Sequence, residues 1–223
     1  MSGLIRNGDC DSDGVHLNGQ DSYIFLNVPV NTTVHALTVS WWMKTSSDKQ
    51  NGTAVVVQTD RAKVYVRTEA VNGANDPLSL GLSTVLLESD WSWAVEKVIH
   101  ANPFPINQDD EYHHFALVVD DHTKFSQYTV HPALALYMDG YAIASATEWK
   151  IPDEFDPVVR GVWLGSSEPE RSNYQDPWDT TFSLEASYRD VRIWERALTV
   201  NELRSFVPPT FANAPGEHVV PIE

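Results

Sequence analysis

Acidic side chains near the start of the chain have a spacing that is typical of calcium-binding loops. The string Asp9-Cys-Asp-Ser-Asp-Gly14 places Asp9, Asp11 and Asp13 at alternate positions before a glycine. A chain that turns here can direct alternate carboxylates at one hard cation. An EF-hand loop needs a bidentate Glu at its twelfth position. Counted from Asp9, the twelfth residue here is Gln20, so an EF-hand is excluded. A looser calcium loop and a hydrated turn stay open, and Ca²⁺ is the cofactor that the sequence suggests.

General acid–base catalysis has few candidates. Glycan hydrolysis needs two carboxylates held across the scissile bond. Glu88 with Asp90 and Glu154 with Asp156 have strand spacing, but both pairs lack the third carboxylate of a Glu-x-Asp-x-Glu pattern. His113 and His114 are adjacent, so on a strand they point to opposite faces and cannot bind one ion together. If the protein is an enzyme, we expect His114, Asp90 and Glu88 to supply the acid and the base. The sequence has no Gly-x-Ser-x-Gly elbow, and a Ser-His-Asp or Cys-His set stays open.

Aromatic side chains beside amides and carboxylates are the best ligand-binding candidates. The string Asn173-Tyr-Gln-Asp-Pro-Trp-Asp179 combines two flat rings with hydrogen-bonding groups, and a second group lies around residues 90–93. Flat rings stack on sugars while polar groups bind their hydroxyls. The expected ligand-binding residues are Trp91, Trp93, Tyr174, Asp176, Trp178 and Asp179. The competing interpretation is that these tryptophans cover the core.

Charge restricts the class of partner. The chain of 223 residues has a formal net charge of −16, and 42% of its residues are hydrophobic. Such an acidic surface repels phosphate backbones and anionic lipids, so we expect neither nucleic acid nor membrane as a partner. A carbohydrate or another small molecule is the expected ligand. The exposed edge of a sheet also makes a homodimer compatible with each of these functions.

Cysteine content and the first residues bear on location. Cys10 is the single cysteine, so neither an intrachain disulfide nor a cysteine zinc site can form. The sequence begins without the long apolar run of a signal peptide, and no stretch is apolar for long enough to span a bilayer. As written, the chain is expected to be cytoplasmic, or secreted if a leader has been removed.

Alternation of apolar and polar residues predicts strands along most of the chain. In residues 37–44 one face carries Leu37, Val39, Trp41 and Met43. The pair Asp139-Gly140 lies between two apolar runs and predicts a β-hairpin over residues 133–144, because a type I′ turn needs positive φ at both central positions. Further strands are expected at residues 113–119, 161–165 and 188–194.

Helix signals are scarce. Thr199-Val-Asn-Glu202 fits a capping box, with Leu203 and Phe206 as the buried side of a short helix. Residues 90–100 fit either a second short helix or a strand. Many short strands with almost no helix predict an all-β sandwich or barrel. We expect one domain over residues 1–206, followed by a tail with prolines at 207–223.

Five segments, in order, resemble the laminin-G-like and concanavalin A-like jelly-roll family. The most specific is Asp190-Val-Arg-Ile-Trp-Glu-Arg-Ala-Leu198, which is similar to the family's closing strand. The others are the opening strands at 14–24, the core strand at 37–44, the His-His strand at 112–119 and the hairpin at 136–140. The resemblance implies a two-sheet antiparallel jelly-roll β-sandwich with one or two short helices. Residues 60–110 match nothing typical of the family and are expected to be an insertion.

The resemblance also implies classes of function. Such folds are found in lectins, receptors, glycan hydrolases and lyases, so the fold alone does not fix the activity. The family often has an acidic metal-binding residue where this chain has Arg189, and the neighbouring Asp190 therefore joins Asp9, Asp11 and Asp13 as a metal candidate. We expect a non-enzymatic, lectin-like carbohydrate-binding module, with calcium as a contributor. The alternative is a lyase, cyclase or isomerase that uses acid–base catalysis in the jelly-roll groove.

Overall fold

The structure is a computed structural model that describes residues 3–28, 36–45, 52–59, 62–70, 78–87, 93–100, 111–120, 134–146, 158–166 and 183–208. Within these residues the chain forms fourteen strands and one short helix. The strands are β1 (Gly3–Arg6), β2 (Asp9–Cys10), β3 (Val15–Asn18), β4 (Tyr23–Leu26), β5 (Ala36–Lys44), β6 (Gly52–Thr59), β7 (Ala62–Ala70), β8 (Leu78–Leu87), β9 (Trp93–His100), β10 (His113–Asp120), β11 (Leu134–Met138), β12 (Tyr141–Ala146), β13 (Val159–Leu164) and β14 (Glu185–Trp194). The helix is α1 (Val200–Ser205).

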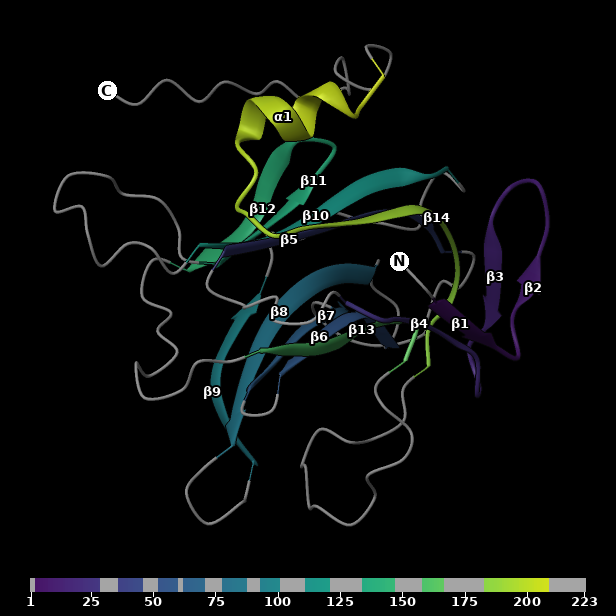
Figure 1. Ribbon diagram of the computed structural model, residues 1–223, viewed down its shortest axis with the longest axis horizontal. Coiled ribbons are helices and arrows are strands. Elements are labelled where there is room, and N and C mark those ends of the chain that lie inside the picture. The colour runs from purple at the N-terminus through teal and green to yellow at the C-terminus, as the bar shows by residue number, and fades with distance from the viewer. Residues whose placement is uncertain are drawn as a thin grey trace, which may run out of the picture.

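The described strands form two antiparallel sheets that lie one above the other (Figure 1). Sheet A has the strand order β1-β4-β13-β6-β7-β8-β9, and sheet B has the order β12-β11-β10-β5-β14-β3-β2. The chain crosses repeatedly from one sheet to the other, as between β3 and β4, β5 and β6, and β13 and β14. The predicted two-sheet jelly-roll sandwich is therefore confirmed.

Apolar side chains from the facing surfaces of both sheets fill the space between them. The predicted inner face of β5 is confirmed, because Leu37, Val39, Trp41 and Met43 all lie in the main core. Sheet A contributes the alternating valines of β6 and β7 to the same core. Removal of this apolar surface from water is the main source of stability for such a sandwich.

A polar contact also joins the two sheets inside this core. Tyr188 of β14 is fully buried, and its hydroxyl donates a hydrogen bond to the Ala54 carbonyl of β6 at 3.0 Å. The Gly165 backbone N–H donates to the same carbonyl at 3.1 Å. Burial raises the pKa of Tyr188, because the apolar interior disfavours the phenolate. The hydroxyl is therefore protonated at neutral pH and can act as the donor of this hydrogen bond.

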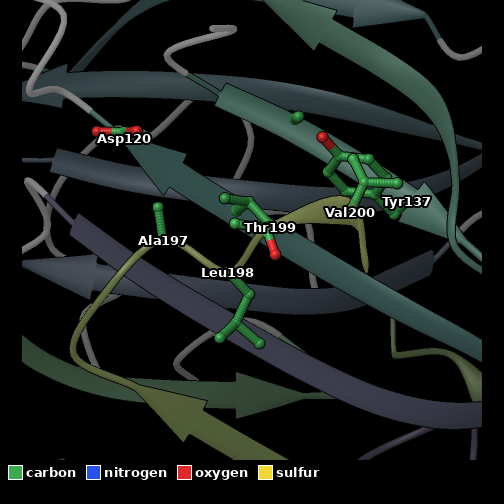
Figure 2. A pocket seen from close by; sticks show the side chains of 8 residues that line it. Asp120, Tyr137, Ala197, Leu198, Thr199 and Val200 are labelled. Atoms are coloured by element: carbon green, nitrogen blue, oxygen red, sulfur yellow. The ribbon is translucent and has the colours of Figure 1, made fainter. Parts of the chain in front are cut away.

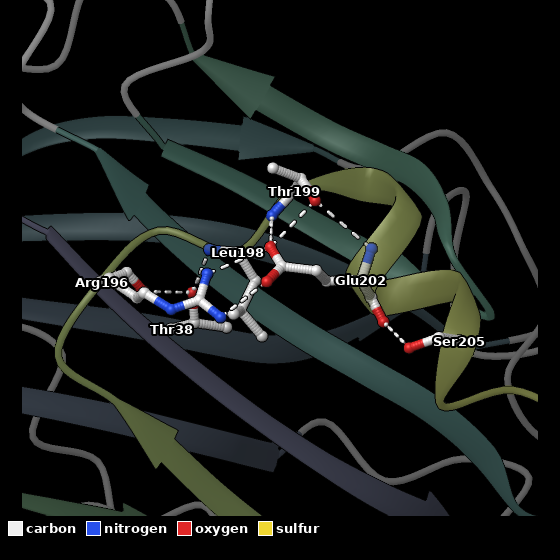
Figure 3. Close-up of polar contacts among 6 residues, drawn as sticks. All are labelled: Thr38, Arg196, Leu198, Thr199, Glu202 and Ser205. Carbon is white, nitrogen blue, oxygen red and sulfur yellow. Dashed lines mark hydrogen bonds and ion pairs between the residues drawn. The ribbon is translucent and has the colours of Figure 1, made fainter.

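The predicted capping box and hairpin turn are both confirmed. The Thr199 hydroxyl accepts from the Glu202 backbone N–H, and the Glu202 carboxylate accepts from the Thr199 N–H at 2.8 Å (Figure 3). Arg196 donates two hydrogen bonds to the same carboxylate, and these contacts lower the pKa of Glu202 to about 2. In the hairpin, Asp139 and Gly140 have φ values of 49° and 78°, as a type I′ turn requires.

Helix α1 and the residues around it cover one half of the outer face of sheet B (Figure 1). Leu198 and Leu203 pack on Ala116, Val118 and Tyr137. After the helix, the ring of Phe206 packs against the ring of His114 on β10.

That histidine, His114, is enclosed by aromatic rings. Its ring centroid lies 5.3 Å from the ring centroid of Trp42 and 5.8 Å from that of Phe206. Its exposed fraction is 3%, and burial lowers its pKa to about 4. His114 is therefore neutral at pH 7, and its position supports a packing role.

The region predicted as an insertion contributes strands to sheet A. β7, β8 and β9 pair in sequence, beginning on β6. Of the two interpretations for residues 90–100, the strand is confirmed and the helix is wrong over residues 93–100. β8 supplies hydrogen-bond partners for the backbone of residues 93–100. Because this pairing satisfies the backbone N–H and C=O groups, the stretch forms a strand despite its local helix signals. Among the described residues, no helix is long and apolar enough to cross a membrane.

Replacement of Tyr188 by Phe should destabilise the fold by about 1 kcal/mol, because the hydrogen bond between the sheets is lost while the ring still fills its site. Urea unfolding followed by tryptophan fluorescence measures this change. Tyr141→Phe is the matched control, since Tyr141 is 48% exposed. Equal stability of the two variants would contradict the structural role of the Tyr188 hydroxyl.

Stability should also fall in mild acid because of His114. Its pKa is about 4 in the folded protein against a reference value of 6.5, so the unfolded chain binds more protons between these values. The contribution is complete above pH 6.5 and is lost as pH falls towards 4, with a total of roughly 3 kcal/mol. Unfolding free energies of wild type and His114→Phe, measured from pH 7 to pH 4.5, should diverge as pH falls. Parallel curves would show that His114 does not carry this dependence.

Candidate functional site

Most of the residues that the sequence predicted to bind ligand lie outside the described part of the chain. These are Trp91, Tyr174, Asp176, Trp178 and Asp179, together with the acid–base candidates Glu88 and Asp90. Trp93 is described through its backbone, which pairs with Leu87 at the start of β9. These assignments therefore stay predictions, but the described residues that flank them show where they join the sandwich.

The two predicted loop groups join sheet A at opposite ends of its strands. Residues 167–182 leave after Ser166 and return at Ser183, which pairs with Thr53 near the start of β6. Residues 88–92 join β8 to β9 near Ala62, which follows the end of β6. The joining points of the two groups therefore lie about six residues apart along β6, or roughly 20 Å at the usual rise of a strand.

The predicted metal carboxylates make protein contacts in the structure. Asp11 Oδ1 accepts hydrogen bonds from the backbone N–H groups of Asp13 and Gly14 at 2.7 and 3.1 Å. The Asp13 amide, followed by the His16 ring, lowers the pKa of Asp11 below its usual value. Asp9 lies on β2. Within the described ranges, no group of three or more His, Cys, Asp or Glu side chains is placed so that it could hold a metal ion.

Asp190 lies apart from the amino-terminal carboxylates in a bulge of β14. The register against β5 shifts between Arg189 and Arg192, and Asp190 has a φ of 48°. Its carboxylate accepts two hydrogen bonds from Arg192, at 2.8 and 2.7 Å. The calcium assignment stays a prediction, and the contacts seen here are those of a turn and an ion pair.

His113 contributes to the hairpin. Its Nδ1 lies 2.7 Å from the Asp139 carboxylate, which also accepts from the His114 backbone N–H at 2.9 Å. The two histidines point to opposite faces of β10, as the sequence predicted. One is tied to the hairpin turn and the other is packed beneath Phe206, so both have structural partners.

The half of the outer face of sheet B that α1 leaves uncovered carries a group of polar and aromatic side chains, which we call the open patch. Cross-strand register brings its members together, because Ser187 is opposite both His16 and Lys44, and Arg189 is opposite Trp42. The open patch consists of Asp11, Asp13, His16, Trp42, Lys44, Tyr112, Ser187 and Arg189.

Arg189 is the centre of the open patch. Its guanidinium carbon lies 3.9 Å from the ring centroid of Tyr112 and 5.4 Å from that of Trp42. It also forms an ion pair with Asp13 at 3.6 Å, and its side chain is 43% exposed. Lys44 lies over Tyr112 at 5.4 Å. Stacking on both rings orients the guanidinium while its N–H groups remain accessible to a ligand.

A polar chain of three residues crosses the edge of the open patch. His16 Nδ1 lies 2.7 Å from Ser187 Oγ, and His16 Nε2 lies 3.0 Å from Asp11 Oδ2. The second distance is within hydrogen-bonding range, but the ring N–H is not well aligned with the carboxylate, so the contact is mainly electrostatic. No local sequence pattern indicates this grouping, since it depends on the register between β3 and β14.

A small cavity lies on the other half of this face, where the residues before α1 cross β10 and β11 (Figure 2). Its volume is about 230 Å³. Its lining is mostly apolar and consists of Val118, Asp120, Ala135, Tyr137, Ala197, Leu198, Thr199 and Val200. Small-molecule sites usually exceed about 300 Å³, so we interpret this cavity as space left by the packing of the helix on the sheet.

Solved structures with this fold include enzymes and binding proteins. The sialidase of Trypanosoma rangeli, in complex with 2,3-difluorosialic acid, matches with a TM-score of 0.58 and 10% identity, over 92% of this chain and 28% of the sialidase. A Bacteroides ovatus protein, assigned provisionally as carbohydrate-binding, matches with a TM-score of 0.54 and 19% identity, over 86% of this chain and 45% of that one. This chain thus spans less than half the length of either protein, and these identities show a shared fold alone.

Comparison by sequence gives the family. No curated protein is similar to the chain. The family model of the concanavalin A-like lectin/glucanases superfamily matches residues 18–204, which include the core strands of both sheets, the closing strand and most of α1. The chain therefore belongs to the concanavalin A-like lectin and glucanase superfamily.

Proposed function

We propose that the protein is a lectin-like module that binds carbohydrate at the open patch. Membership of the superfamily supports this proposal, as does the fold shared with the Bacteroides ovatus protein. The observation that carries it is the position of Arg189, which is stacked on two rings and remains 43% exposed.

The chemistry of the open patch suits the hydroxyl groups of a sugar. Arg189 offers several N–H donors in one plane, and Asp13 and Asp11 offer carboxylate acceptors beside it. Sugars bind through such combinations of donors and acceptors, together with apolar contact to a ring. Because stacking restricts the guanidinium before a ligand arrives, less conformational entropy is lost on binding.

The predicted aromatic loop joins the sandwich near this surface. Residues 167–182 return to the described chain at Ser183, and β14 then leads to Ser187. Four residues of strand correspond to about 13 Å. We propose that Tyr174, Asp176, Trp178 and Asp179 complete the site and supply the rings for sugar stacking. Trp91 and Trp93 belong to the region near the other end of sheet A, so this proposal does not use them.

Acid–base catalysis by His114 is the weaker proposal. Its ring is enclosed by Trp42 and Phe206 and is uncharged at neutral pH, so it is poorly placed to exchange protons with a ligand. Calcium remains part of the proposal as a contributor that an experiment can separate from direct sugar binding.

Arg189→Ala should weaken glycan binding at least about tenfold, which corresponds to roughly 1.4 kcal/mol. A glycan array with neutral and acidic sugars first identifies a ligand, and calorimetry then gives the dissociation constants. Arg160→Ala is the matched control, since Arg160 is an exposed arginine on sheet A. Trp178→Ala tests the contribution of the loop, and the array is repeated with EDTA to test calcium.

Absence of any bound glycan would reject the lectin proposal. Binding by Arg189→Ala as tight as that of wild type would reject the open patch as the site. Loss of binding in EDTA would place calcium at or near the sugar.

A further inference from the structure

The chain of contacts among Asp11, His16 and Ser187 has the composition of a hydrolytic triad. β3 and β14 pair in antiparallel register, and Ser187 lies directly opposite His16. Side chains at opposite positions of such a pair project from the same face, so the imidazole meets the hydroxyl at 2.7 Å. Asp11, in the turn before β3, approaches the other ring nitrogen at 3.0 Å.

The three residues lie on three neighbouring segments: Asp11 in the turn before β3, His16 on β3 and Ser187 on β14. The Asp11 carboxylate is fixed by the backbone N–H groups of residues 13 and 14. The ring of His16 lies between that carboxylate and β14, and its side chain is 35% exposed. Nδ1 faces the serine and Nε2 faces the aspartate, and either imidazole nitrogen can act as the base when the other carries the proton.

We propose that Ser187 is a nucleophile for small carboxylic esters, with His16 as its general base and Asp11 as the positioning residue. Ser187 Oγ attacks the carbonyl carbon as its proton moves to His16 Nδ1, and the carboxylate of Asp11 stabilises the resulting imidazolium. The bond between carbon and the alcohol oxygen then breaks, and His16 returns the proton to the leaving alcohol. Water, deprotonated by His16, releases the acid and restores the Ser187 hydroxyl.

The surroundings supply stabilising charge and limit the substrate. Lys44 is opposite Ser187 on β5, so a cation lies on the same face where the carbonyl oxygen becomes negative. The Tyr112 hydroxyl donates a hydrogen bond to the Asp13 carbonyl oxygen at 3.3 Å, in the turn that also carries Asp11. Ser187 is half-buried on a sheet surface, so an acyl group as small as acetyl can reach Oγ with the least steric hindrance.

This activity goes beyond the proposed carbohydrate binding and does not depend on it. The probe 4-nitrophenyl acetate carries no sugar, so failure of glycan binding and failure of ester hydrolysis are separate results. A fluorophosphonate probe reports covalent reaction at the serine, and peptide mass spectrometry locates the label.

Wild type should take one fluorophosphonate label, at Ser187, and should hydrolyse 4-nitrophenyl acetate. Ser187→Ala should abolish the label and reduce hydrolysis by about 100-fold or more, and His16→Gln should reduce it to a similar degree. Ser145→Ala is the matched control, since Ser145 is another strand serine of sheet B and is exposed. Circular dichroism confirms that each variant is folded.

Asp11 is tested separately because it acts through His16. Asp11→Asn should lower kcat by about tenfold and leave KM unchanged, and Asp11→Glu should restore part of the loss. A merely structural role would change both parameters or neither. The proposal is overturned if folded wild type gains no label at Ser187, or if Ser187→Ala hydrolyses the ester as fast as Ser145→Ala.

Discussion

Burial of apolar side chains between two sheets is the interaction on which the rest of this structure depends. Trp41 and its neighbours on β5 face the valines of β6 and β7, and their exposed fractions are near zero. The Tyr188 hydroxyl adds a directed contact, because it reaches across the interface to the Ala54 carbonyl. Apolar burial has no preferred direction, whereas a hydrogen bond requires one relative position of β14 and β6.

A close contact between the backbones of Gly14 and Tyr188 positions the turn before β3 against β14. A side chain at Gly14 would place Cβ 2.5 Å from the Tyr188 carbonyl oxygen, and Gly14 has a φ of 150° that other residues rarely adopt. Glycine here lets the chain before β3 pass directly against β14. The same passage brings the turn with Asp11 beside the strand that carries Ser187 and Arg189. The open patch therefore depends on packing that is needed for the fold itself.

The outer face of sheet B is divided between structure and proposed function. On one half, Leu203 and Phe206 cover apolar and aromatic side chains. On the other half, Arg189 lies over Tyr112 and Trp42 and still contacts solvent. Stacked cations shield the rings and also provide donors, so one set of side chains can serve stability and recognition.

The sequence by itself determined the local elements. Period-two alternation identified the core face of β5, Asp139-Gly140 identified the hairpin, and Thr199 with Glu202 identified the cap of α1. Each of these signals acts over a few residues, so it can be recognised without knowledge of the fold. Residues 93–100 fitted either a helix or a strand by local pattern. They form the strand β9 because they pair with β8, and a local pattern carries no information about that pairing. The tertiary structure alone brought Asp11, His16 and Ser187 together, because residues 171 positions apart meet only through strand register.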